Sequence, residues 1–106
     1  MQGEMVPVVL VPRSTSWCAG SIYSTAPLDV TAYDRLVVLF DGASSDPVAF
    51  QESHDSVTWF DLATATSPTQ VRVDLTRRWL RLHVDLTGEG DGFAGCCVGS
   101  LRRRID

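Results

Sequence analysis

Apolar and polar side chains alternate with a period of two along much of this chain. The alternation is strictest over residues 79–86. Successive side chains of a strand point to opposite faces, so this segment predicts a strand with one face in a core. The expected core face consists of Leu80, Leu82, Val84 and Leu86. The expected outer face consists of Trp79, Arg81, His83 and Asp85.

Similar patterns elsewhere bring the expected total to about eight short strands, with no helical periodicity between them. The strand-like segments are 6–11, 17–23, 35–41, 48–53, 57–62, 70–75, 79–86 and 93–101. Turns or loops are expected between them, at 13–16, 24–33, 42–47, 63–69, 76–78 and 87–92. Many short strands separated by turns are typical of a β-sandwich or barrel. We predict an all-β fold: one antiparallel, jelly-roll-like β-sandwich domain over residues 1–106, with flexible ends at 1–4 and 102–106.

Residues 48–62, VAFQESHDSVTWFDL, predict a hairpin on which the other strands pack. Two strand-like segments flank the polar turn 53–56. Val48, Phe50 and Glu52 share one side of the first segment. We expect Phe50 and Trp59 to be large side chains of the core.

Residues 35–41, RLVVLFD, form the most apolar run and are apolar on both sides. One side carries Leu36, Val38 and Phe40, and the other carries Val37 and Leu39. A strand of this kind has both faces covered, either within its own domain or by a partner. We therefore expect a central strand here.

Composition narrows the class of protein. The 106 residues include 44% hydrophobic residues and carry a net charge of −4, which disfavours disorder and indiscriminate nucleic-acid binding. No apolar run approaches the ~20 residues of a membrane span, and the N-terminus lacks the basic start of a signal peptide. All nine basic residues are Arg, and seven of them lie in residues 72–106. Arg suits planar contacts at interfaces, so we expect a protein partner and neither nucleic acid nor a membrane.

Reactive chemistry has little support in the sequence. His54 and Asp55 lie in the predicted hairpin turn, but no G-x-S-x-G segment offers a nucleophile. The loop carboxylates Asp41, Asp46, Glu89 and Asp91 lack EF-hand spacing. Cys18, Cys96 and Cys97 are odd in number and favour core filling over a disulfide framework. We therefore predict no catalytic residue, no metal and no cofactor.

The candidate site is an interaction surface. Trp, Arg and His alternate on the outer face of 79–86, and Trp and Arg are enriched at interface hot spots. We expect Trp79 to stack on the guanidinium of Arg81. The alternative is a second layer whose charges pair across strands. Arg102, Arg103 and Arg104 complete the predicted surface as a basic arm, or else form a solubilising tail.

Two segments carry a resemblance to a known family: FQESHDSVTW at 50–59 and RWLRL at 78–82. Together they are similar to F-x-x-S-x-D-x-x-x-W followed by R-[YW]-[LIV]-R, a pattern of small β-sandwich virion proteins of tailed phages and prophages. The same pairing resembles the discoidin-like (galactose-binding-like) jelly roll. Ser56 departs from the pattern, where Gly is usual, and the chain is shorter than a full discoidin domain.

The resemblance implies a non-enzymatic virion component, assembled in the bacterial cytoplasm. It would bind the major capsid protein or another virion protein as a head decoration, a cement protein, or a part of the neck or tail. We expect it to be a homo-oligomer, since decoration depends on many copies. The alternative is a carbohydrate-binding module that uses Trp17, Tyr23 or Trp79 as a stacking platform.

Overall fold

The computed structural model describes residues 4–44, 48–65, 67–87 and 92–104. These residues form nine β-strands and no helix. The strands are β1 (Met5–Trp17), β2 (Ile22–Ser24), β3 (Leu28–Asp29), β4 (Tyr33–Ser44), β5 (Val48–Ser53), β6 (Phe60–Ala65), β7 (Thr69–Asp74), β8 (Trp79–Asp85) and β9 (Phe93–Arg103).

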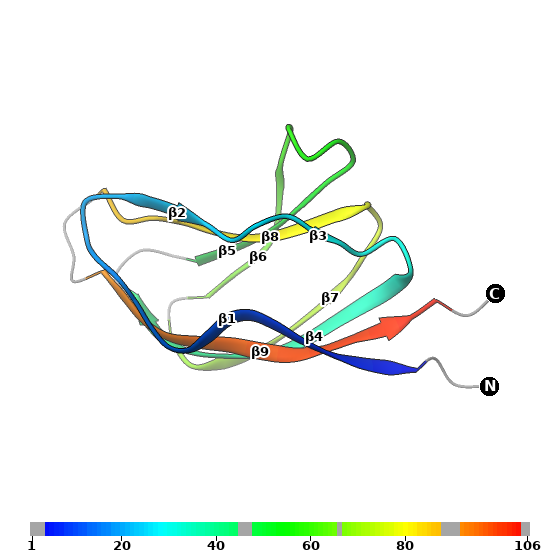
Figure 1. Ribbon diagram of the computed structural model, residues 1–106, viewed down its shortest axis with the longest axis horizontal. Coiled ribbons are helices and arrows are strands. Elements are labelled where there is room, and N and C mark those ends of the chain that lie inside the picture. The colour runs from blue at the N-terminus through cyan, green and yellow to red at the C-terminus, as the bar shows by residue number, and fades with distance from the viewer. Residues whose placement is uncertain (1–3, 45–47, 66, 88–91, 105–106) are drawn as a thin grey trace.

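The strands form two antiparallel sheets that pack as two layers (Figure 1). One sheet has the order β1-β9-β4-β7, and the other has the order β2-β8-β5-β6 with β3 also paired to β8. The pairs β5 with β6, β4 with β7, β2 and β3 with β8, and β1 with β9 are nested one outside the next. The chain is thus a ribbon folded back at the β5–β6 connection and rolled into two sheets. The predicted all-β, jelly-roll-like sandwich is confirmed.

The inward faces of the two sheets form one hydrophobic core. The predicted inward residues of β8 and Leu86, which directly follows β8, are at most 1% exposed, and Leu36, Val38 and Phe40 of β4 are buried as predicted. The largest buried rings are Phe40, Phe50 and Phe93, so Phe50 is confirmed as a core residue. Each such side chain stabilises the fold by about 1.5–3 kcal/mol when fully removed from water.

β1 differs most from the sequence prediction. Residues 13–16 were expected to form a turn, but β1 continues through them to Trp17. The polar residues are accommodated by a register shift between Val11 and Thr15, with Ser14 at a φ of 65°. A bulge of this kind bends a strand without ending it. Trp17 therefore ends β1, and the predicted strand 17–23 is reduced to β2.

The edge strand of the five-stranded sheet is split into β2 and β3, and β3 lies within residues 24–33, which were expected to be a plain connection. Between β2 and β3, Thr25 makes the hydrogen bonds to the Leu82 backbone that an edge strand would otherwise make. The Thr25 N–H donates to the Leu82 carbonyl at 2.9 Å, and the Leu82 N–H donates to Thr25 Oγ1 at 2.9 Å. The Thr25 hydroxyl therefore accepts a hydrogen bond from the buried Leu82 N–H at the point where the edge strand is interrupted.

Other boundaries also moved. β6 begins at Phe60 and runs through residues 63–65, which were expected to be a loop, while residues 57–59 lie outside any strand. β9 extends to Arg103, so the tail predicted from Arg102 starts later. Gly99 lies in the middle of β9, where an added Cβ would come within 2.1 Å of the Val37 carbonyl oxygen. The glycine therefore allows β9 to lie close against β4.

Candidate functional site

The predicted surface residues of β8 share the outer face of the five-stranded sheet. Trp79, Arg81 and His83 are partly buried, and Asp85 is exposed. Across the sheet, Arg81 lies opposite Gln51 of β5, which in turn lies opposite Asp61 of β6. The register therefore brings residues from three strands into one polar row.

Hydrogen bonds connect this row from strand to strand. Arg81 Nε donates to Gln51 Oε1 at 2.8 Å, and Gln51 Nε2 donates to Asp61 Oδ1 at 2.8 Å. Burial lowers the pKa of Arg81, although a guanidinium remains protonated at neutral pH. Pairing across strands, the alternative that the sequence left open, is thus present on this face.

The aromatic partner of Arg81 is Trp59. The Arg81 guanidinium carbon lies 4.2 Å from the Trp59 ring centroid, whereas Trp79 lies beside Arg78 at 5.0 Å. The expected stacking of Trp79 on Arg81 is therefore wrong. Trp59 is also not a core residue as predicted: it is partly buried and covers the outer face of the sheet. The β5–β6 connection turns outward before β6 starts, and this carries the indole to the other side of the sheet.

Ser53 and Asp55 form the frame of this connection, which projects outward from its sheet in Figure 1. The Asp55 carboxylate accepts the N–H groups of Val57 and Thr58, both at 2.9 Å. The Ser53 hydroxyl donates to Asp55 Oδ1 at 3.0 Å and accepts the Ser56 N–H at 2.9 Å. The two backbone bonds from Thr58 and Val57 hold the pKa of Asp55 below its usual value.

Ser56, the position that departs from the family pattern, has a φ of 59°. This left-handed conformation is one that glycine adopts without strain and that other residues rarely adopt. Ser56 adopts it while its N–H is bonded to the buried Ser53 hydroxyl. The loop geometry is therefore maintained by side-chain hydrogen bonds in place of a glycine.

His83 and Asp85 complete the predicted outer face of β8. His83 Nδ1 lies 2.6 Å from Ser24 Oγ on the neighbouring edge strand. The side-chain and backbone hydrogen bonds from Thr87 lower the pKa of Asp85. Both residues are therefore held by local partners.

A buried carboxylate, which the sequence analysis did not single out, anchors one end of the sandwich. Glu52 is 1% exposed and pairs with the guanidinium of Arg77. Thr76 Oγ1 also donates to Glu52 at 3.2 Å, and Arg77 lies 4.8 Å from the ring centroid of Phe60. The signal was present in the sequence, because Glu52 has the same inward register as Val48 and Phe50.

The three C-terminal arginines do not form one arm. Arg102 pairs with Asp34 at 2.9 Å, and Arg103 pairs with Glu4 at 3.6 Å. Arg104 Nε donates to the Thr31 carbonyl at 3.2 Å. Arg102 lies on the four-stranded sheet, so the structure separates it from the outer face of β8.

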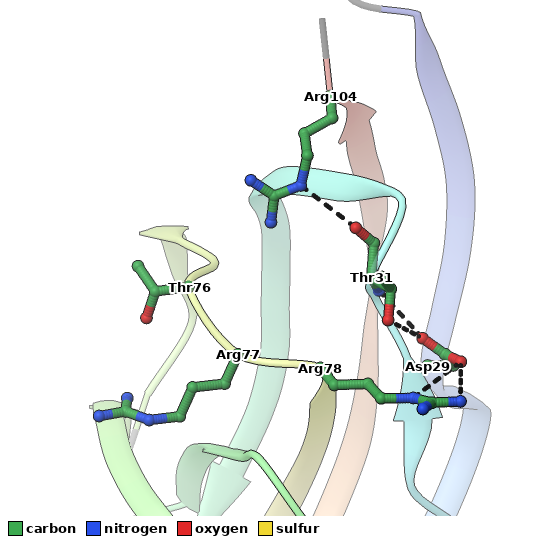
Figure 2. A pocket seen from close by; sticks show the side chains of 6 residues that line it. All are labelled: Asp29, Thr31, Thr76, Arg77, Arg78 and Arg104. Carbon is green, nitrogen blue, oxygen red and sulfur yellow. Dashed lines mark hydrogen bonds and ion pairs between the residues drawn. The ribbon is translucent and has the colours of Figure 1, made fainter. Parts of the chain in front are cut away.

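Arg104 borders an open hollow of about 550 Å³ at the end of the sandwich (Figure 2). The lining residues are Asp29, Thr31, Thr76, Arg77, Arg78 and Arg104. In Figure 2 the side chains of Arg77 and Arg78 point in opposite directions, and Arg78 donates to Asp29 at 3.2 Å. In Figure 2 Arg104 is joined to Thr31 through its Nε, and Arg77 makes its ion pair with Glu52, outside the hollow. The hollow therefore lacks convergent groups for holding an anion or activating a nucleophile.

The cysteines and the loop carboxylates are the remaining residues that the sequence offered for catalysis or metal binding. Burial raises the pKa of the Cys97 thiol to about 12, which makes it an unreactive core residue. Among the described residues, no three His, Cys, Asp or Glu side chains gather to hold a metal ion. Asp46, Glu89 and Asp91, considered for calcium, lie outside the described residues.

Compared with known proteins, the chain matches no family model, no curated protein and no solved structure. Within the described part of the chain, no helix could cross a membrane.

Proposed function

We propose that this chain is a non-enzymatic structural protein of a phage or phage-like particle that binds the capsid as a decoration, cement or head-associated protein. One observation supports this role most. The residues of the family-like pattern converge on one unit, in which Ser53 and Asp55 frame a projecting loop and Trp59 lies on Arg81. A pattern that builds an outward surface is what a docking protein requires.

The proposed docking surface, which we call the Trp59–Arg81 surface, consists of Trp59, Trp79, Arg81 and Gln51. Its side chains are already held by cross-strand bonds and ring contacts before any partner arrives. Held side chains lose little rotamer freedom on binding, and Trp and Arg often dominate binding energies. A capsid protein would therefore meet a rigid aromatic and cationic face.

Co-sedimentation with capsids tests this proposal. The double variant Trp79→Ala with Arg81→Ala should leave the capsid pellet, while the wild-type protein stays in it. Arg13→Ala is a matched control, because it removes an exposed arginine from the other sheet. Equal occupancy of the double variant would reject this surface, and failure of the wild-type protein to bind capsids would reject the function.

The carbohydrate-binding alternative has weaker support. A jelly roll is compatible with either role, because lectin and capsid domains share it. Trp17 and Tyr23, however, stack on each other with ring centroids 5.1 Å apart, and Trp17 also contacts Phe93 at 5.0 Å. Rings engaged in this way offer little free face to a sugar. A glycan array with binding lost in Trp79→Ala would favour this alternative.

A further inference from the structure

The outer face of the four-stranded sheet carries an uncovered apolar patch. Val9 of β1 is 60% exposed and Leu39 of β4 is 59% exposed. Both lie opposite Val98 of β9, so the three side chains form one row across three strands. A second row, with Pro7, Ser100 and Val37 in register, lies beside it and ends at Arg72 of β7. Contiguous apolar surface of this kind marks a site of protein contact.

Charged residues border the patch with opposite signs at its two ends. Asp41 follows Leu39 along β4 and is exposed. At the other end of β4, Arg35 lies opposite Arg102 of β9. Asp74 pairs with Arg35 at 3.3 Å, and Asp34 pairs with Arg102 at 2.9 Å. Arg72 of β7 lies in the next row, opposite Val37. The face is therefore negative at the Asp41 end, mainly apolar in the middle, and keeps a small positive excess toward the Arg35 end.

We propose that this face binds a second copy of the chain. The two-fold axis lies in the plane between the two stacked sheets, runs perpendicular to the strands and passes over Val38 of β4. The axis reverses β4 of one copy over β4 of the other. Leu39 of each copy then covers Val37 of the other, and Asp41 of each copy approaches Arg35 of the other. An isologous interface requires this kind of self-complementarity.

The twist of packed sheets is compatible with this arrangement. Aligned sheets cross at about 30°, which displaces the ends of the contact by roughly one strand spacing. A displacement toward β9 brings Asp41 to Arg102 in place of Arg35, whereas a displacement toward β7 would bring it to Asp74. The arrangement therefore requires the ends of the contact to move toward β9. A parallel overlay would instead bring the arginine ends of the two copies together, which like-charge repulsion disfavours.

The area of the patch indicates how strong the dimer should be. Four strands spaced by about 4.8 Å, the polar edge strand β7 included, and a length of about 20 Å from Asp41 to Arg35 give roughly 400 Å² as an upper value on each copy. Roughly 800 Å² in total is below the ~1,200 Å² of stable complexes, so the dimer should be weak. The proposal goes beyond the virion role and does not depend on it.

Sedimentation equilibrium over protein concentrations up to about 1 mM is the test, since that range includes weak dissociation constants. The wild-type protein should dimerise, and Leu39→Glu should weaken the dimer at least about tenfold, since each copy loses a buried contact. Ile22→Glu is the matched control, because Ile22 is 57% exposed on the other sheet. Thermal unfolding of both variants establishes that they remain folded.

Charge reversal tests the orientation. Asp41→Arg and Arg35→Asp should each weaken the dimer, and the double variant should dimerise more tightly than either single variant. A wild-type protein that stays monomeric throughout, or equal effects of Leu39→Glu and Ile22→Glu, would overturn the proposal. Failure of the double variant to recover would overturn the two-fold arrangement, and larger assemblies would indicate a head-to-tail contact instead.

Discussion

The two outer sheet faces of this molecule differ in the residues that they carry and in what covers them. On the five-stranded sheet, Arg81 is covered by Trp59 and bonded to Gln51, so the face carries its own second layer. On the four-stranded sheet, Val9 and Leu39 remain largely exposed. The difference comes from the connections, because the β5–β6 connection folds over one sheet and no described segment folds over the other.

This contrast shows how a single jelly roll can support two kinds of contact. A polar face held by its own bonds is rigid and selective, and it suits a partner of different sequence. A bare apolar face suits a partner that brings an equal apolar surface, and a second copy does so by symmetry. In our two proposals, the first face binds the capsid and the second binds another copy of the chain.

The largest expected effect on the free energy of unfolding comes from breaking the buried Glu52–Arg77 ion pair, compared with the exposed Arg35–Asp74 pair of the four-stranded sheet. Arg77→Met leaves the buried Glu52 carboxylate without its cation and should lower the free energy of unfolding by about 3 kcal/mol. Arg35→Met breaks an exposed pair with Asp74 and should cost less than about 1 kcal/mol. Urea denaturation of both variants measures the difference. Equal costs would remove the energetic contrast between the two pairs.

A smaller effect is expected from removing the indole that covers the polar face. Trp59→Ala should lower the free energy of unfolding by about 1–2 kcal/mol, because it removes apolar contact and the stacking on Arg81. The Arg81 Nε–H should also exchange faster with water in NMR spectra. Trp79→Ala serves as the comparison, since the Trp79 ring lies beside Arg78. An unchanged Arg81 signal in Trp59→Ala would contradict the covered face.

Acid should loosen the same cover through Asp55. Its pKa is lowered in the folded protein, so its contribution is complete above the usual value of 3.8 and is lost as the pH falls through the folded value. The Trp59 indole N–H signal should shift in that acidic window. Asp55→Asn keeps an acceptor oxygen but cannot titrate there, so its shift should be much smaller. An identical acid transition in Asp55→Asn would assign the change to other carboxylates, such as Asp29 or Asp34.

The smallest expected effect on the free energy of unfolding comes from a substitution on the exposed apolar face of the four-stranded sheet. Leu39→Glu should change the free energy of unfolding of the dilute monomer by less than about 0.5 kcal/mol, because the side chain is already exposed. Chemical denaturation at low micromolar concentration provides the measurement. A cost above 2 kcal/mol would mean that Leu39 supports the monomer fold and not an interface.

The sequence was a good guide wherever a strand alternates without interruption. Leu80, Leu82 and Val84 were placed correctly because their burial depends only on the local period of two. The same rule indicated that Val37 and Leu39 would need a cover, which the described part of the chain does not provide.

Long-range and loop-dependent features were not predictable in this way. Residues 13–16 are typical turn residues, yet pairing with β9 keeps them within a strand. Trp59 looked like a core residue because its neighbours are β-formers, but the loop frame at Asp55 directs it outward. The Glu52–Arg77 pair joins residues separated by 25 positions, and local periodicity cannot find such a partner.

A dilution series followed by two-dimensional NMR tests the contrast between the faces most directly. We expect concentration-dependent shifts at Val9, Leu39 and Val98, while the indole signal of Trp59 and the Nε–H of Arg81 stay constant. Shifts confined to the Trp59–Arg81 surface, or none on either face up to about 1 mM, would contradict the account.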